Sequence, residues 1–190
     1  MIVDRADAAA ALTAIGDAER ETTRAIVYGI ASSYLILWGV VTMTGYVADD
    51  IKPQYAWIIW LVLDGIGFAA TIWISIRNKT GVRPDQKILA RKLLAAQFVL
   101  VVFAILVTNI MQPLTARQIG AFVPLVFMLG YVLAGLWFGR FFILCGAVIA
   151  VLTLAVFWWA GPWFSLDMAM VSGGVLIFSG LWLRRVGASL

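Results

Sequence analysis

The stretch RFFILCGAVIAVLTLAVFWWAGPWFSLD, residues 140–167, contains 26 consecutive uncharged residues between Arg140 and Asp167. An α-helix needs about 20 apolar residues to cross the hydrocarbon core of a bilayer. Three further uncharged runs, of 24, 24 and 22 residues, lie between Arg24 and Asp49, Lys92 and Arg117, and Arg117 and Arg140. The spacing of the charges therefore predicts a series of membrane-spanning helices.

The composition supports this prediction. Of the 190 residues, 63% are hydrophobic and 13% are charged, and the mean hydropathy is +0.98. A soluble domain has about half apolar and a quarter charged residues, so this class is excluded. A membrane β-barrel would show alternating polarity, which the run FVLVVF at residues 98–103 lacks. The predicted fold class is all-α, a polytopic membrane protein.

Two further spans each contain one carboxylate, so that six helices are expected in total. Their predicted ranges are 25–47, 55–76, 90–111, 119–138, 141–160 and 165–183. A single helix over the roughly 48 residues between Arg117 and Asp167 would be far too long for a bilayer, so Gly139 and Arg140 must form a tight turn. The six helices form a membrane domain over residues 25–185, between a segment at 1–24 and a short tail at 186–190.

The lysine and arginine residues predict the orientation. If the N-terminus is cytoplasmic, 12 of the 14 lie on the cytoplasmic side, and only Lys52 and Arg117 lie outside. Both termini, with the segment at 1–24 and the tail, are then cytoplasmic in a multi-pass protein of the cell inner membrane. The first 24 residues contain five acidic residues and resemble no cleavable signal peptide.

The Ala-rich segment at residues 1–24 has good helix formers and a weak apolar face, which contains Ala8, Leu12 and Ile15. One interpretation is a cytoplasmic extension of the first membrane helix, or a helix in the membrane interface. The other is a docking helix that binds a cytoplasmic partner or a second copy of the chain.

Asp64 is the main candidate for a functional residue, because it lies about nine residues into the predicted helix 55–76. A charged Asp near the bilayer centre costs about 2.5–3.5 kcal/mol, and such residues usually face a bundle interior or a wet cavity. Residues expected at a comparable depth are Gln97, Ser33 and Tyr34. Asp64 is thus a titratable site for a transported solute or ion, or else a hydrogen-bonding group that holds helices together.

Asn109 and Asp167 are expected to form a polar rim at the outer side. Asp167 opens the predicted helix 165–183, where a carboxylate complements the helix dipole, and an outer cation site is the alternative. Asp64 and Asp167 lie at different depths, so they cannot form the shared carboxylate pair of an aspartate protease.

Other chemistry is disfavoured by what the sequence lacks. It has no His and one cysteine, Cys145, so haem ligation, imidazole metal sites and iron–sulfur clusters are not expected. We therefore expect no enzyme activity, no metal and no cofactor. The net charge of +4 reflects the cytoplasmic lysine and arginine residues and gives no reason to expect nucleic-acid binding.

Two motifs carry a family resemblance. The stretch YLILWG at residues 34–39 and the ending GLWLRR at residues 180–185 resemble those of small bacterial six-helix inner-membrane proteins, which implies no particular activity. In topology alone the chain is similar to the substrate-binding subunits of energy-coupling-factor vitamin transporters. Those subunits dock through small residues on their first helix, and Ala25, Gly29 and Ser33 could imitate that face; because the resemblance is one of topology alone, it implies no binding residues here.

Two functions remain open from the sequence. The first is non-enzymatic transport or permeation of a small solute or ion, with Asp64 as the titratable group. The second is a membrane-embedded accessory or sensory subunit that binds a cytoplasmic partner through its N-terminal helix. In both, the expected partners are the lipid bilayer and either a second copy of the chain or another membrane protein.

Overall fold

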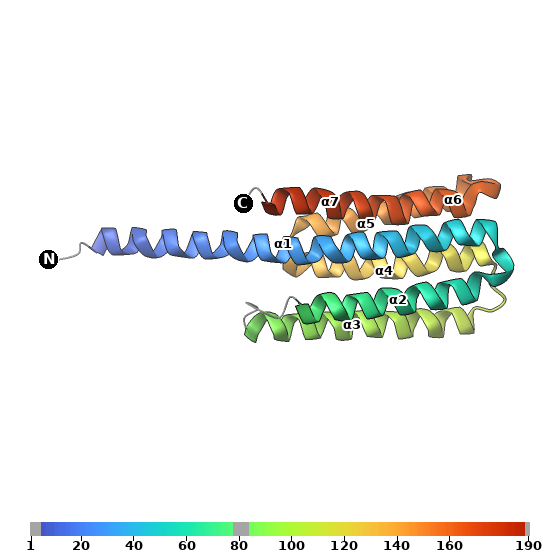
Figure 1. Cartoon of the computed structure of the whole chain (residues 1–190), viewed down its shortest axis with the longest axis horizontal. Coiled ribbons are helices and arrows are strands. Elements are labelled where there is room, and N and C mark those ends of the chain that lie inside the picture. Colours follow the sequence, from blue (N-terminus) through green and yellow to red (C-terminus); the bar gives the residue numbers. More distant parts are fainter. Residues whose placement is uncertain (1–4, 78–83, 189–190) are drawn as a thin grey trace.

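The computed structural model describes the backbone of residues 5–77 and 84–188, and the side chains of residues 13, 14, 16, 28–77, 95–136 and 139–187. The described chain is almost entirely helical (Figure 1). Its elements are α1 (Arg5–Ile51), η1 (Pro53–Tyr55), α2 (Ala56–Arg77), α3 (Pro84–Ile110), α4 (Ala116–Phe138), α5 (Arg140–Trp159), η2 (Gly161–Trp163), α6 (Phe164–Met168), the π-helical turn η3 (Ala169–Gly174) and α7 (Val175–Ala188).

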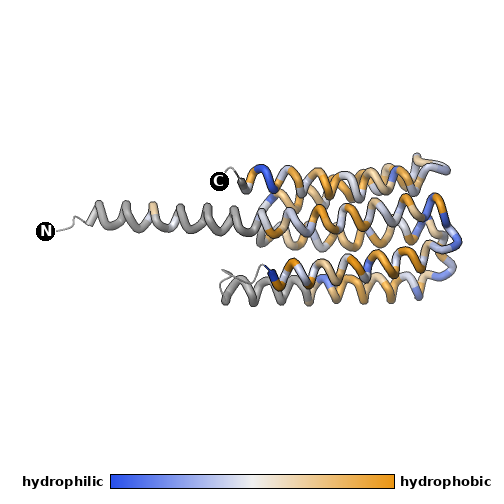
Figure 2. The backbone as a smooth tube through the Cα atoms, in the orientation of Figure 1, coloured by the Kyte–Doolittle hydropathy of each residue, from blue (hydrophilic) through white to orange (hydrophobic). Residues whose placement is uncertain are grey.

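Among the residues that the structure describes, five helical segments are long and apolar enough to cross a membrane. They are Tyr28–Ile51, Pro53–Arg77, Ala116–Leu136, Arg140–Trp159 and Gly161–Gly187. The apolar part of α3, Ala95–Ile110, is shorter. Hydrophobic residues cover the length of the bundle, while hydrophilic ones gather near its two ends (Figure 2). The all-α prediction is confirmed, and these helices are compatible with an integral membrane protein.

Most predicted helix ends lie within a few residues of the observed ones, but three elements differ. Helix α3 begins at Pro84, six residues before the predicted start at residue 90. Helix α1 is continuous from Arg5 to Ile51. From Arg5 on, the backbone of the predicted N-terminal segment is therefore an extension of the first membrane helix. The predicted helix 165–183 is instead α6, η3 and α7 in succession. The tight turn is confirmed: Gly139 has a φ of 112°, which favours glycine, and α5 begins at the next residue. Residues 1–4 and 189–190 of the predicted terminal segments lie outside the described residues.

The helices pack in two groups. Helices α1, α2, α6 and α7 form one group, and α3, α4 and α5 form the other. In the first group, the backbones of α1 and η3 approach closely at Gly173, where a Cβ atom would lie 2.5 Å from Cβ of Met43. In the second, Gly146 of α5 packs against the carbonyl oxygen of Met128 in α4. Small residues thus let the backbones touch, as is usual for membrane helices.

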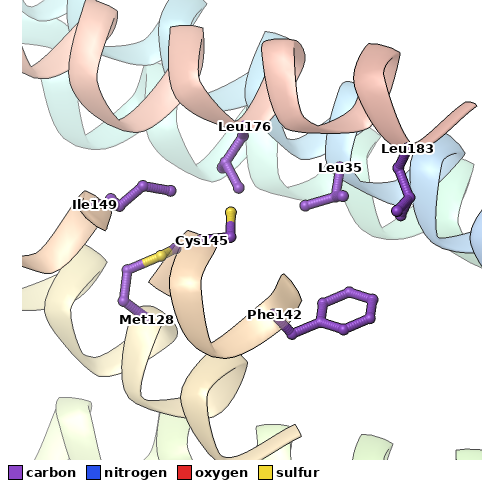
Figure 3. Close-up of a cluster of buried hydrophobic side chains, with 7 residues drawn as sticks. All are labelled: Leu35, Met128, Phe142, Cys145, Ile149, Leu176 and Leu183. Carbon is purple, nitrogen blue, oxygen red and sulfur yellow. The ribbon is translucent and has the colours of Figure 1, made fainter. Parts of the chain in front are cut away.

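A cluster of buried apolar side chains joins the two groups (Figure 3). It draws on α1, α4, α5 and α7 and consists of Leu35, Met128, Phe142, Cys145, Ile149, Leu176 and Leu183. Cys145 points from α5 towards α7, and its thiol lies 3.5 Å from the hydroxyl of Ser179. No described side chain of α2 or α3 belongs to this cluster, which places the described parts of these two helices outside the central core.

The two ends of the bundle differ in their connections. Helix α1 enters and α7 ends at the same end, here called the termini end (Figure 1). At the opposite end, here called the far end, the Tyr46 hydroxyl donates to the carbonyl of Gly120 and so ties α1 to α4. Close by, Trp60 of α2 donates to Asp49 of α1 over 2.8 Å. The first of these contacts holds the two helix groups together at the far end, and the second ties α2 to α1 within its group.

Candidate functional site

A cavity of about 330 Å³ lies where the two helix groups meet, and we call it the interface cavity. Its polar lining residues are Asp64, Gln97, Thr108 and Gln112. Its apolar walls come from α1, α2, α3 and α4 and include Trp38, Phe68, Val101, Ala104, Ile105, Ile119, Val123, Val126 and Phe127. A few polar groups on mostly apolar walls are typical of a small-molecule site.

The cavity exists because α2 and α3 do not pack against each other along their described length. Helix α2 packs on α1, and α3 packs on α4, while contacts between α2 and α3 are few. On α2, Gly67 is buried, against Trp38 and Val41 of α1. The space between α2 and α3 is therefore left to the cavity.

Asp64 lies in this cavity and is half-buried. Within the described part of the chain, no donor hydrogen-bonds to its carboxylate and no cation pairs with it. A carboxylate that served only to hold helices together would bond to a neighbouring helix, because an unpaired polar group in an apolar surrounding is costly. The arrangement leaves both oxygens of Asp64 available to a ligand or a proton.

Gln97 of α3 lines the same cavity. It is half-buried, and its Oε1 atom lies so close to α4 that a Cβ atom on Gly130 would be 2.8 Å from it. Gly130 therefore makes room for the Gln97 amide. The cavity thus has an amide on its α3 wall and a carboxylate on its α2 wall.

The other two residues predicted beside Asp64 lie elsewhere, and that prediction was wrong. Ser33 is exposed and donates to the carbonyl of Gly29, while the Tyr34 hydroxyl is 2.8 Å from the Ser75 hydroxyl. Residue counting failed because α1 continues to Ile51, which shifts its register against α2.

The register of α1 against α2 follows from their contacts. Tyr34 meets Ser75 near the termini end, and Asp49 meets Trp60 at the far end. Asp64 is four residues after Trp60, so it is level with about Gly45, four residues before Asp49. Ser33 and Tyr34 lie about three turns nearer the termini end.

The predicted polar rim residues do not line the interface cavity. Asn109 is exposed near the end of α3, and its side-chain amide donates to the carbonyl of Ile105 over 2.8 Å. Asp167 lies half-buried in the first turn of α6, the position expected for a carboxylate that complements the helix dipole.

Sequence reasoning missed the aromatic wall of the cavity. The rings of Trp38 and Phe68 meet edge to face with centroids 5.2 Å apart, and Trp38 comes from the middle of the first span. A tryptophan that only anchors a helix lies at the membrane interface. An indole in the middle of a span was therefore a signal that the side chain has another role. Gln112, which follows the end of α3, also lines the cavity.

The described residues contain no group of three or more His, Cys, Asp or Glu side chains placed to hold a metal ion. The chain has no significant match to a protein-family model, to a curated protein or to a solved structure. The interface cavity and its lining residues are therefore the observations that bear on function.

Proposed function

We propose that this protein moves a small solute or ion across a membrane without enzymatic chemistry, and that Asp64 is the titratable group of the pathway. The observation that carries the proposal is the unpaired carboxylate in a cavity between two helix groups. Ionisable residues within membrane helices mark solute and ion pathways. The alternative role of Asp64, as a bond between helices, lacks a bonding partner among the described residues.

The proposal includes six membrane spans with both termini in the cytoplasm, in the cell inner membrane. The positively charged residues support this orientation, since by sequence 12 of the 14 belong to segments that this topology assigns to the cytoplasm. In this arrangement the residues of α3 that precede Ala95 form the remaining part of its membrane crossing. The interface cavity then lies within the depth of the bilayer, where a solute needs a polar group to replace its water.

Asp64→Asn is expected to lower the flux through the protein about tenfold or more, because the amide keeps the shape of the side chain but cannot carry a charge or release a proton. The measurement is the decay of an imposed proton gradient in proteoliposomes that contain a pH-sensitive dye. Asp50→Asn is the matched control, because Asp50 is an exposed carboxylate at the end of α1. An unchanged decay rate in Asp64→Asn, or the same loss in Asp50→Asn, contradicts the proposed role.

A second candidate is an accessory or sensory subunit that binds a cytoplasmic partner. It is favoured by α1, which has 47 residues and extends well beyond the neighbouring helix ends (Figure 1). The 23 residues of α1 before Tyr28 correspond to about 35 Å of helix. A helix of this length is a surface on which a partner protein can dock.

Deletion of residues 1–20 separates the two candidates. If the protein is a transporter, the truncated chain keeps the flux of the full chain within about twofold, because the interface cavity begins at Trp38 in sequence. If it is an accessory subunit, the truncated chain loses the protein that copurifies with the full chain. Both measurements use the same affinity-purified preparation: the solute flux is measured in one portion, and the copurifying protein is identified in another.

A further inference from the structure

The interface cavity borders a strongly apolar surface. On α3, the side chains of Phe98 and Ile105 are 69% and 55% exposed, and on α2, Leu61 is 66% exposed. Ile105 also lines the cavity, and α2 and α3, which both line it, make few contacts with each other. In a membrane the exposed apolar side chains of these two helices face the hydrocarbon, so a molecule dissolved in lipid can approach the cavity between α2 and α3.

The lining of the cavity combines one acid with aromatic rings. Asp64 is its only acidic lining residue, and no basic residue lies among the described residues that line it. Trp38, Phe68 and Phe127 supply aromatic surface in the same walls. A cation is attracted both by a carboxylate and by the face of an aromatic ring. The charge of the site therefore complements a ligand with a single positive charge.

The shape and polarity of the lining favour an organic cation over a bare metal ion. Metal ions such as Ca²⁺ and Mg²⁺ take six or more oxygen ligands, whereas most of this lining is apolar. A volume of about 330 Å³ is at the lower end of the roughly 300–1,000 Å³ range of small-molecule sites, so the cavity suits a small ligand. Apolar walls around one charge suit an ammonium group with a hydrocarbon body.

We propose that the interface cavity binds lipophilic monovalent cations of the aryl- or alkylammonium class, which enter from the bilayer between α2 and α3 and pair with Asp64. The inference deepens the proposed function by naming its substrate class. Asp64 supplies the charge, the Gln97 amide supplies a polar neighbour, and Trp38 and Phe68 enclose the apolar body.

The test is binding of benzyltrimethylammonium to the full chain in lipid nanodiscs, measured by equilibrium dialysis. Wild type and Asp50→Asn are expected to bind it equally, and Asp64→Asn about tenfold or more weakly, because a charge pair away from water is lost. Neopentylbenzene, which has the same shape without the charge, is expected to bind wild type and Asp64→Asn equally. Equal binding of benzyltrimethylammonium to wild type and Asp64→Asn, or no binding to either, overturns the proposal.

Two further readings complete the test. Sodium chloride at the same concentration as benzyltrimethylammonium is expected to displace none of it, and displacement by sodium would overturn the organic class in favour of an inorganic cation. Equal unfolding temperatures of wild type and Asp64→Asn show that lost binding is not lost folding. Asp64-dependent proton flux without benzyltrimethylammonium binding would refute this inference alone, whereas binding without any flux would refute the proposed transport function.

Discussion

Gly173→Ala is expected to destabilise the protein by about 3 kcal/mol, because the added methyl group has no room between η3 and α1. A Cβ atom at Gly173 would lie 2.5 Å from Cβ and 2.8 Å from Cα of Met43. Backbone atoms cannot rotate away as the end of a flexible side chain can, so the helices themselves must separate. The expected fall in unfolding temperature is roughly 6–12 °C for a chain of this size, measured by thermal unfolding in detergent micelles.

Gly174→Ala is a closely matched control for this prediction. Gly174 lies in the same π-helical turn, and a Cβ atom there meets nothing within 4 Å. Both substitutions remove a flexible glycine, a change that stabilises a helix by up to about 1 kcal/mol. Only Gly173→Ala adds a collision, so the difference between the variants measures the close approach of η3 and α1. Equal unfolding temperatures for the two variants would show that this approach is not required.

Arg117→Met is expected to destabilise the protein by about 2–3 kcal/mol, since its guanidinium bonds to carbonyl groups at the C-terminal end of α5. One nitrogen donates to the carbonyl of Phe157, and another donates to Gly161 over 3.2 Å. The charged group also lies 5.6 Å and 5.3 Å from the ring centres of Phe157 and Phe164. Methionine keeps the apolar stem and loses all of these interactions. Thermal unfolding in detergent micelles measures the loss.

Two controls accompany this substitution. Arg140→Met removes an exposed arginine at the start of α5 and is expected to change stability by less than about 0.5 kcal/mol. Arg117→Lys keeps the positive charge near the end of α5 but cannot donate to two carbonyls in the fixed geometry of a guanidinium. The unfolding temperature of Arg117→Lys should therefore lie between those of wild type and Arg117→Met. If Arg117→Met unfolds at the temperature of Arg140→Met, the bonds from Arg117 contribute no net stability.

The helices could be predicted because a bilayer restricts the length and composition of a crossing segment. The runs of uncharged residues placed α2, α4 and α5 within about three residues of their observed ends. The π-helical turn η3 could not be predicted in this way, because its hydropathy is that of an ordinary membrane helix. Its position is known from the structure, where it brings Gly173 against Met43.

The candidate site was predicted in part. Asp64 was identified because a charge in mid-span has no explanation in topology, and Gln97 because it was expected at a comparable depth. Ser33 and Tyr34 were chosen by depth alone, and the contact of Tyr34 with Ser75 shows that this depth was wrong. Apolar residues such as Phe68 carry no signal in the sequence, because cavity walls and lipid-facing surfaces use the same side chains.

The sequence by itself determined that the chain is a set of apolar helices and where most of these helices begin and end. It also singled out the one charged residue that the membrane topology does not explain. These features follow from the cost of placing charges and unpaired backbone groups in hydrocarbon, and that cost acts on each segment separately. Only the tertiary structure decided that α1 packs on α7, that α2 and α3 stay apart, and that Asp64 and Gln97 line one cavity. Lipid is as apolar as these side chains, so close backbone contacts, rather than hydrophobicity, select which helices meet.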